Sequence, residues 1–324
     1  MTRQVRAALL GRCVILLVLA LFLRLLPSLK LSPRLLFDRP QPYADEPVPP
    51  AQEEAPRHEI PQLRFRDLPW DEPAETIPPA PLPAFTAEDA ARLNIRGNCT
   101  LSYDAAALLT APLPAAAADG PQVLIVHTHS TEAYEPEPGW EYEETESYRT
   151  LDPECSVIRL GSEIAAVLEG HGISVLHDQA VNDYPSYAGS YDRMAAIIDD
   201  YLVQYPSIRM VLDVHRDAFE NPDSSMGGTA ENGMAKVMLV VGTDEGGLDH
   251  PDWQTNLSCA MKLEMLLRET PGLSRGISLV TQRYNQHLTP LSLLAEFGAA
   301  GDTLQEAIRA AQAFAESLAR LLCG

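Results

Sequence analysis

The chain has 324 residues, of which 24 are Lys or Arg and 45 are Asp or Glu, so its formal net charge at pH 7 is −21. This excess of acid argues against a nucleic-acid partner, because phosphate binding requires a basic face. Hydrophobic residues make up 46% of the sequence, which is ample for a folded core and excludes wholesale disorder. Residues 1–37 contain six basic residues and no acid, whereas the rest of the chain carries 18 basic and 45 acidic residues. We therefore expect the two parts to work in different surroundings.

The basic N-terminal part contains a candidate membrane anchor. Residues 7–26 read AALLGRCVILLVLALFLRLL, and about 20 apolar residues are needed to cross a bilayer. The two arginines near its ends can reach the headgroups, and Arg3 and Arg6 ahead of it favour a cytoplasmic N-terminus. A cleaved signal peptide is the main alternative, although no clear small-x-small cleavage site follows the apolar run. We expect residues 1–29 to be a retained single-pass anchor, with the rest of the chain outside the cytoplasm.

A proline-rich segment follows the anchor. Residues 27–83 contain 15 of the 27 prolines, and proline supports neither helices nor strand ladders. We expect residues 30–84 to be a disordered, extended linker that holds the remaining domain away from the membrane.

From residue 85 the composition is that of a folded domain, residues 85–324. Continuous apolar runs typical of strands buried on both faces alternate with amphipathic helical segments. This pattern predicts an α/β fold with a mostly parallel sheet flanked by helices. The predicted strands are residues 122–127, 173–177, 209–215, 235–241, 276–280 and 291–296, and the predicted helices are residues 85–93, 104–109, 155–170, 187–204, 253–268 and 302–322.

Polar side chains lie at three of the predicted strand ends. His127 and His129 follow the first strand, His215 ends the third, and Glu296 ends the last. In open α/β sheets, chemistry collects beyond the carboxyl ends of the strands. Two imidazoles, nearby carboxylates and a separate Glu are the groups that a catalytic zinc hydrolase needs. No HExxH or CxxC motif is present, so satisfied polar residues at the strand ends remain an equal alternative.

Several long motifs decide between these alternatives: VLIVHTHSTEAY, SYRTLDPECSVIRLGSEIAAVLEGHG, DYPSYAGSYDR, YPSIRMVLDVHRDA, KVMLVVGTDE, RGI at residues 275–277, RYNQHL and LLAEFG. From about residue 95 to the end, the chain resembles the stage II sporulation protein P family, which consists of membrane-anchored cell-wall hydrolases of spore-forming bacteria. More distantly it is similar to the zinc-dependent N-acetylmuramoyl-L-alanine amidases. The resemblance implies hydrolysis of the amide between N-acetylmuramic acid and the stem peptide of peptidoglycan, with an additional endopeptidase activity on cross-links.

The resemblance also implies a Zn²⁺ site. The amidases' acidic ligand opens the first long helix, which places it at Asp152, with Glu154 and Glu132 as alternatives. Glu296, in LLAEFG, resembles their general base. Alternation along the first strand predicts that both histidines of HTH lie on one side, so both are kept. The implied zinc ligands are His127, His129, Asp152 and His215.

Two further groups are candidates for the substrate. Arg216 could add positive charge to the oxyanion, or it could pair with a neighbouring Asp. The stretch Tyr284, Asn285 and Gln286 offers polar donors and an aromatic ring to a glycan strand; the alternative is a polar turn.

Partners and place in the cell follow from the resemblance alone. The family works with a stage II sporulation protein D-like lytic transglycosylase and a stage II sporulation protein M-like membrane protein during engulfment, at the mother-cell engulfing membrane. Two other functions remain open: a catalytically inert wall-binding scaffold, and a zinc carboxypeptidase or deacetylase that acts on peptidoglycan.

Overall fold

The computed structural model of the chain describes residues 76–115, 120–218 and 233–324. The predicted anchor and most of the predicted linker lie outside these residues. No helix among them is long and apolar enough to span a bilayer.

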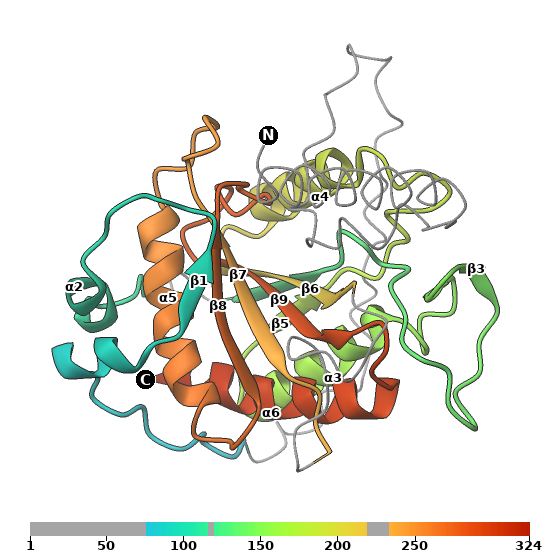
Figure 1. Cartoon of the computed structure of the whole chain (residues 1–324), viewed down its shortest axis with the longest axis horizontal. Helices are drawn as coiled ribbons and strands as arrows, with labels where there is room; N and C mark the ends of the chain where they lie inside the picture. The colour runs from blue at the N-terminus through green and yellow to red at the C-terminus, as the bar shows by residue number, and fades with distance from the viewer. Residues whose placement is uncertain (1–75, 116–119, 219–232) are drawn as a thin grey trace, which may run out of the picture. The chain divides into compact units, whose positions relative to one another are not determined.

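A seven-stranded sheet organises the described domain, with the strand order β1-β8-β7-β9-β6-β2-β5 (Figure 1). Every neighbouring pair is parallel except β7 with β9, which is antiparallel. The prediction of a mostly parallel sheet is confirmed. The strands of the sheet are β1 (Ile95–Gly97), β2 (Val123–Val126), β5 (Val175–His177), β6 (Met210–Asp217), β7 (Val237–Gly242), β8 (Ser274–Val280) and β9 (Ser292–Ala299).

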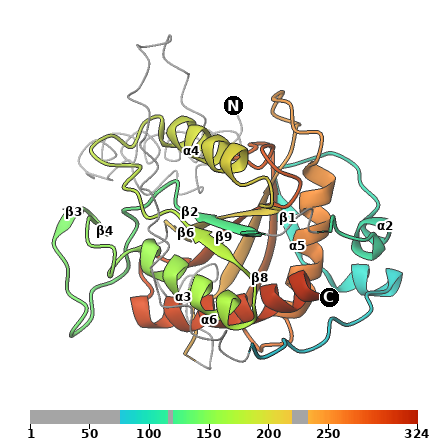
Figure 2. The same cartoon turned by 180° about the vertical axis from the view of Figure 1, so that it is seen from behind.

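Helices cover both faces of the sheet, as the apolar runs of the strands require. Helices α3 (Val157–Gly170), α5 (Trp253–Leu267) and α6 (Leu304–Cys323) enclose the larger core on one face. Helix α4 (Ser190–Gln204) packs on the other face against β2 and β6 (Figure 2).

The remaining elements are short. A 3-10 helix, η2 (Ala87–Arg92), precedes β1, and helix α2 (Ala105–Thr110) lies between β1 and β2 in the sequence. A two-stranded hairpin of β3 (Glu144–Glu146) and β4 (Arg149–Thr150) lies between β2 and α3. Leu82, within the predicted linker, packs against the larger core.

Candidate active site

The carboxyl ends of β2, β6 and β9 bring the central site residues together. His215 of β6 pairs in register with Glu296 of β9, so both side chains lie on the same face of the sheet. Strand β2 ends at Val126, and a tight turn over residues 128–131 follows it. This turn carries His129 to His215, whose ring centroid lies 5.2 Å away at an interplanar angle of 84°.

His215 lies between two carboxylates. Its Nε2 is 2.9 Å from Oδ1 of Asp213, and its Nδ1 is 3.4 Å from Oε2 of Glu132. Burial alone would lower the pKa of His215, but the two carboxylates raise it to about 10. Asp213 is itself held by the backbone amide and hydroxyl of Thr128, at 2.9 and 2.6 Å. The imidazole is therefore fixed in orientation and carries a proton at neutral pH when no other cation is present.

Glu132 is the acid that the structure places beside the histidines. It is buried, and its Oε2 accepts a hydrogen bond from the backbone amide of Arg216 at 3.1 Å. Burial would raise the pKa of Glu132, but His215 and the charge of Arg216 hold it well below its usual value. The predicted ligand Asp152 is instead exposed and accepts a hydrogen bond from the backbone amide of Glu154. Of the three candidate acids, the structure brings only Glu132 to the site.

His129 completes the group from the α4 side. Its Nε2 is 3.0 Å from the hydroxyl of Tyr187, and its Nδ1 is 3.4 Å from Oγ of Ser190. The ring stacks on Tyr187 with a centroid distance of 4.4 Å. Burial lowers the pKa of His129 to about 4. A neutral imidazole at physiological pH can donate a lone pair, which is the form that a metal requires.

His127 lies elsewhere, so the expectation that both histidines of HTH occupy one side is wrong. Its Nδ1 is 3.2 Å from the carbonyl oxygen of Val214, and its Nε2 is 2.8 Å from Nε2 of His177. The pair packs against Gly161 of α3, on the opposite face of the sheet from His215. His127 continues the alternation of β2, whose Val123 and Ile125 face the same core as α3, and only His129, in the turn that follows, reaches the site.

Glu296 is buried, and its Oε2 has no hydrogen-bond partner within the described residues. Burial, followed by the negative charge of Asp217, raises the pKa of Glu296 well above its usual value. Asp217 pairs with Arg275 of β8 at 2.7 Å. Arg275 reaches this end of the sheet because β8 runs opposite to β9 and β6. A buried carboxyl group with a free oxygen beside His215 is suited to proton transfer.

The two arginines near Glu132 have different surroundings. Arg216 is buried and donates to the carbonyl oxygens of Ala133 and Tyr148, at 2.9 and 3.0 Å, so it holds the loop that carries Glu132. These hydrogen bonds engage Arg216 within the protein and do not support its predicted contact with the substrate. Arg149 of β4 is more exposed and lies 5.0 Å from the centroid of the Tyr187 ring. Arg149, which was not a predicted site residue, pairs with the buried Asp183 at 2.5 Å and stays partly exposed; its SYRT motif was the available signal.

The predicted substrate-binding stretch divides in two. Tyr284 and Asn285 adopt left-handed backbone conformations, with φ of 45° and 59°. They adjoin Tyr191 of α4, which the Tyr284 ring approaches at 5.4 Å and whose carbonyl oxygen accepts from Asn285 at 2.7 Å. Tyr191 in turn has its ring 5.4 Å from that of His129. Gln286 is buried, and its amide bonds the backbone of β7 through both ends, so we assign it to the packing of the loop.

His129, Glu132 and His215 offer two imidazoles and a carboxylate, which is a donor set that zinc accepts. As the side chains stand, no three His, Cys, Asp or Glu residues in the described part of the chain meet the geometry of a metal site. The 3.4 Å between Nδ1 of His215 and Oε2 of Glu132 is close to the roughly 3.3 Å that separates two ligand atoms in a tetrahedral zinc site. The donor set fits zinc, therefore, provided that His129 turns from Tyr187 toward these two atoms.

Residues 79–319 match the family described as stage II sporulation protein P (SpoIIP). The chain belongs to the stage II sporulation protein P family. The resemblance inferred from the motifs is thereby confirmed. The chain is 30% identical over 210 residues to stage II sporulation protein P of Bacillus subtilis (strain 168), an alignment that covers 60% of this chain and 49% of that protein. The chain thus spans about half the length of this stage II sporulation protein P.

Two solved amidase structures show a weak structural similarity to this member of the stage II sporulation protein P family. The N-acetylmuramyl-L-alanine amidase Ami1 from Mycobacterium smegmatis has a TM-score of 0.39 at 12% identity, covering 62% of this chain and 96% of that chain. The CwlD amidase from Clostridioides difficile, solved in complex with the GerS lipoprotein, has a TM-score of 0.34 at 14% identity, covering 62% and 94%. At these scores the family assignment rests on the sequence match.

Proposed function

We propose that the chain is a zinc-dependent peptidoglycan hydrolase that cleaves the amide between N-acetylmuramic acid and L-alanine, on an amidase-like fold. The observation that carries the proposal is the meeting of His129, Glu132 and His215 with Glu296 at one end of the sheet. Membership in the stage II sporulation protein P family supports it.

In this proposal, His129, Glu132 and His215 hold zinc. The structure already contains the groups that would orient the two imidazoles: Asp213 at Nε2 of His215 and Ser190 at Nδ1 of His129. Such outer contacts fix which ring nitrogen faces a metal. Bound zinc would supply Lewis-acid chemistry, polarising a carbonyl group and making water more acidic.

The remaining groups act on protons and on the substrate. In its carboxylate form, Glu296 takes a proton from the attacking water and returns it to the leaving amine; a raised pKa makes that carboxylate a stronger base. Arg149 is placed to attract an anionic part of the substrate, while Arg216 keeps Glu132 in position. Tyr284 and Asn285 border the site beside Tyr191 and are proposed to contact the glycan.

The setting of the reaction is also a proposal. It comprises a membrane anchor with a cytoplasmic N-terminus, a domain outside the cytoplasm, and work beside a lytic transglycosylase and a stage II sporulation protein M-like protein. A transglycosylase would act on the bare glycan that an amidase leaves, so the two reactions can follow one another. The chemistry also extends to peptide cross-links, because these are amides of the same kind.

The test is metal analysis of the purified chain together with digestion of sacculi. We expect bound zinc and release of intact stem peptides from glycan. His215→Ala should lose zinc and activity, whereas His171→Ala, which removes an imidazole bonded to Ile77 and Glu316 far from the site, should keep both. Full zinc occupancy in His215→Ala would contradict the ligand assignment. A metal-free chain without effect on sacculi would favour the scaffold, and release of D-alanine or acetate would favour a carboxypeptidase or deacetylase.

A further inference from the structure

A cavity lies at the amino ends of strands β2 and β6, opposite the carboxyl ends that carry the proposed active site. It has a volume of about 580 Å³, and Gln122 and Arg209, which immediately precede the two strands, form part of its lining. His215 is six residues beyond Arg209 along β6, which is roughly 20 Å at the usual rise of a strand. The cavity is therefore separate from the proposed active site.

The cavity combines apolar walls with two cations. The walls come from the segment just before η2, from α2 and the loop after it, and from the end of α6. They include Leu82, Phe85, Leu109, Leu113, Leu321 and Leu322. The cations are Arg209 and Lys262 of α5, and Lys262 is buried. Pockets of 300–1,000 Å³ with apolar walls and a few fixed polar groups are typical of small-ligand sites.

Neither cation has an anionic partner. Nη2 of Arg209 donates to the carbonyl oxygen of Leu322 at 2.6 Å, while its buried Nε has no partner in the described part of the chain. Nζ of Lys262 donates to the carbonyl oxygen of Leu108 at 3.0 Å and to Oγ of Ser258 at 2.9 Å. No ion pair between described residues joins either cation to a carboxylate. Burial lowers the pKa of Lys262 to about 8.

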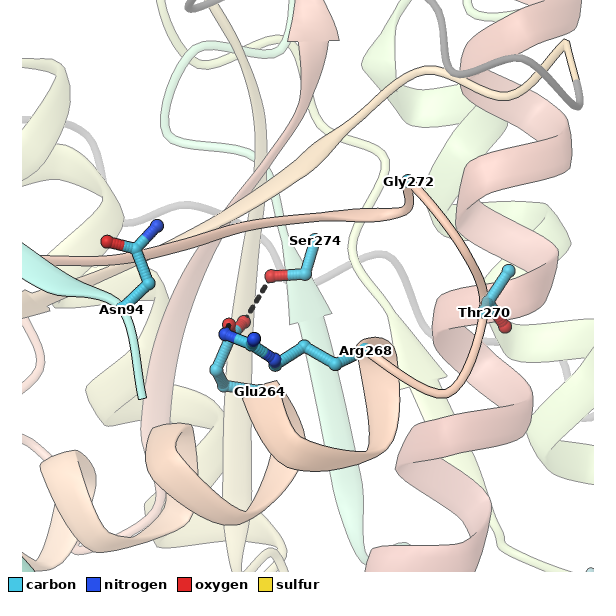
Figure 3. Close-up of a pocket in the computed structure, with 6 residues that line it drawn as sticks. All are labelled: Asn94, Glu264, Arg268, Thr270, Gly272 and Ser274. Carbon is cyan, nitrogen blue, oxygen red and sulfur yellow. Dashed lines mark hydrogen bonds and ion pairs between the residues drawn. The ribbon is translucent and has the colours of Figure 1, made fainter. Parts of the chain in front are cut away.

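A smaller cavity near β8 shows the contrasting arrangement (Figure 3). It has a volume of about 250 Å³, and its cation, Arg268, lies 3.6 Å from the carboxylate of Glu264. Ser274 also donates to Glu264, as the dashed line in Figure 3 marks. The charges of this cavity balance one another without a ligand, whereas those of the larger cavity do not.

We propose that the larger cavity binds an amphipathic anion, with its carboxylate or phosphate head between Arg209 and Lys262 and its alkyl chain along the leucines. Buried charges in proteins are normally paired, because desolvation of an unpaired charge is costly. The chain has 45 acidic residues, yet none of those that the structure describes lines this cavity beside its two cations, so an anion from outside would match their charge. A small inorganic anion would leave the apolar walls in contact with water, whereas an alkyl chain would cover them.

The proposal is tested by titrating the purified chain with decanoate and with decyl phosphate, which separate the two kinds of head. We expect saturable binding of at least one of them. Decanol has the same chain without the charge, and inorganic phosphate has the charge without the chain, so both should bind at least about tenfold more weakly. Equal binding of decanol, or of inorganic phosphate, would overturn the proposal.

Variants locate the site. Arg209→Gln and Lys262→Met should each weaken binding by about tenfold, since a hydrogen bond to a charged group is lost. Arg268→Gln, which removes the paired cation of the smaller cavity, is the matched control and should bind normally. Unchanged binding in both cavity variants would place the ligand elsewhere and refute the assignment.

A measurement on the unmodified chain covers the case in which these variants fail to fold. Cys323 is exposed and lines the cavity, whereas the partly exposed Cys99 lies outside it. Bound decanoate should slow alkylation of Cys323 and leave that of Cys99 unchanged, as read by peptide mass spectrometry. Equal rates at Cys323 with and without saturating decanoate would overturn the proposal.

Discussion

Strands β2 and β6 carry buried charge at both of their ends, but in opposite ways. At their carboxyl ends, His215 lies between Asp213 and Glu132, so each charge has an opposite one within contact. At their amino ends, Arg209 and Lys262 face a cavity that has apolar walls and no acidic side chain among the described residues of its lining.

The difference indicates how each end responds to a ligand. At the paired end, the proton on Nδ1 of His215 occupies the place beside Glu132 that a metal ion would take, so a metal and a proton compete. At the unpaired end, the two cations donate only to neutral oxygens within the described chain, so an anion would add the charge that no acidic side chain of this lining supplies. The following changes separate the two cases, starting with the largest expected effect.

Glu296→Gln should reduce hydrolysis of sacculi by about 10²–10⁴-fold, the usual contribution of a general acid–base group. Zinc content should stay unchanged, because Glu296 is not a proposed ligand. Glu264→Gln is the matched control: it alters another buried carboxyl group with a raised pKa, bonded to Ser274 at the start of β8. Undiminished digestion by Glu296→Gln would remove this residue from the mechanism.

Glu132→Gln should weaken zinc binding by at least about a hundredfold, more than the loss of an outer-shell contact. Asp152→Asn should leave zinc affinity unchanged, because that side chain is exposed and lies away from the histidines. Competition with a chelating dye measures both. The reverse outcome would restore the ligand predicted from the sequence.

Zinc affinity should rise with pH by roughly tenfold per unit below about pH 10, because the metal must displace the proton that His215 holds with a pKa of about 10. In the metal-free chain the sign is opposite. A pKa raised above the unfolded value of about 6.5 stabilises the fold below about pH 6.5, and this contribution is lost as pH rises toward 10. Chelator competition and urea unfolding at several pH values measure the two trends. A zinc affinity independent of pH would contradict them.

Gly161→Ala should lower the free energy of unfolding by about 1–3 kcal/mol, since an added methyl group would meet the ring nitrogens of His127 and His177. Gly170→Ala, in the same helix but with open space around it, should be neutral or stabilising by up to about 1 kcal/mol. Urea denaturation compares them. Equal stability of the two variants would mean that the histidine pair on the far face is not tightly packed.

Much of the fold could be predicted from the sequence, because parallel strands buried on both faces read as continuous apolar runs. Strands β2, β5, β6, β7, β8 and β9 all lie at predicted runs. The hairpin strands β3 and β4 were missed because they are short and polar. The antiparallel pairing of β7 with β9 also escaped prediction, since an apolar run does not specify the direction of its neighbour.

The sequence predicted the candidate site correctly only for residues whose position is set by the end of a strand. His215 and Glu296 end neighbouring strands, and their juxtaposition follows from the sheet. The choice of Glu132 over Asp152 depends on how the chain turns after β2, which sequence spacing does not reveal. His127 continues the alternation of β2 and faces α3 together with Val123 and Ile125, whereas His129 leaves that alternation in the turn after the strand.

The position of β9 affects how the domain can assemble. It is the last strand in the sequence, yet it lies between β6 and β7, which are made earlier. Until residues 292–299 are available, these two strands present open edges to each other, and such edges invite pairing with other chains. The same strand carries Glu296. A chain still emerging from a ribosome or an export channel can therefore present His129 and His215, but it gains its proposed proton-transfer group only as the sheet closes.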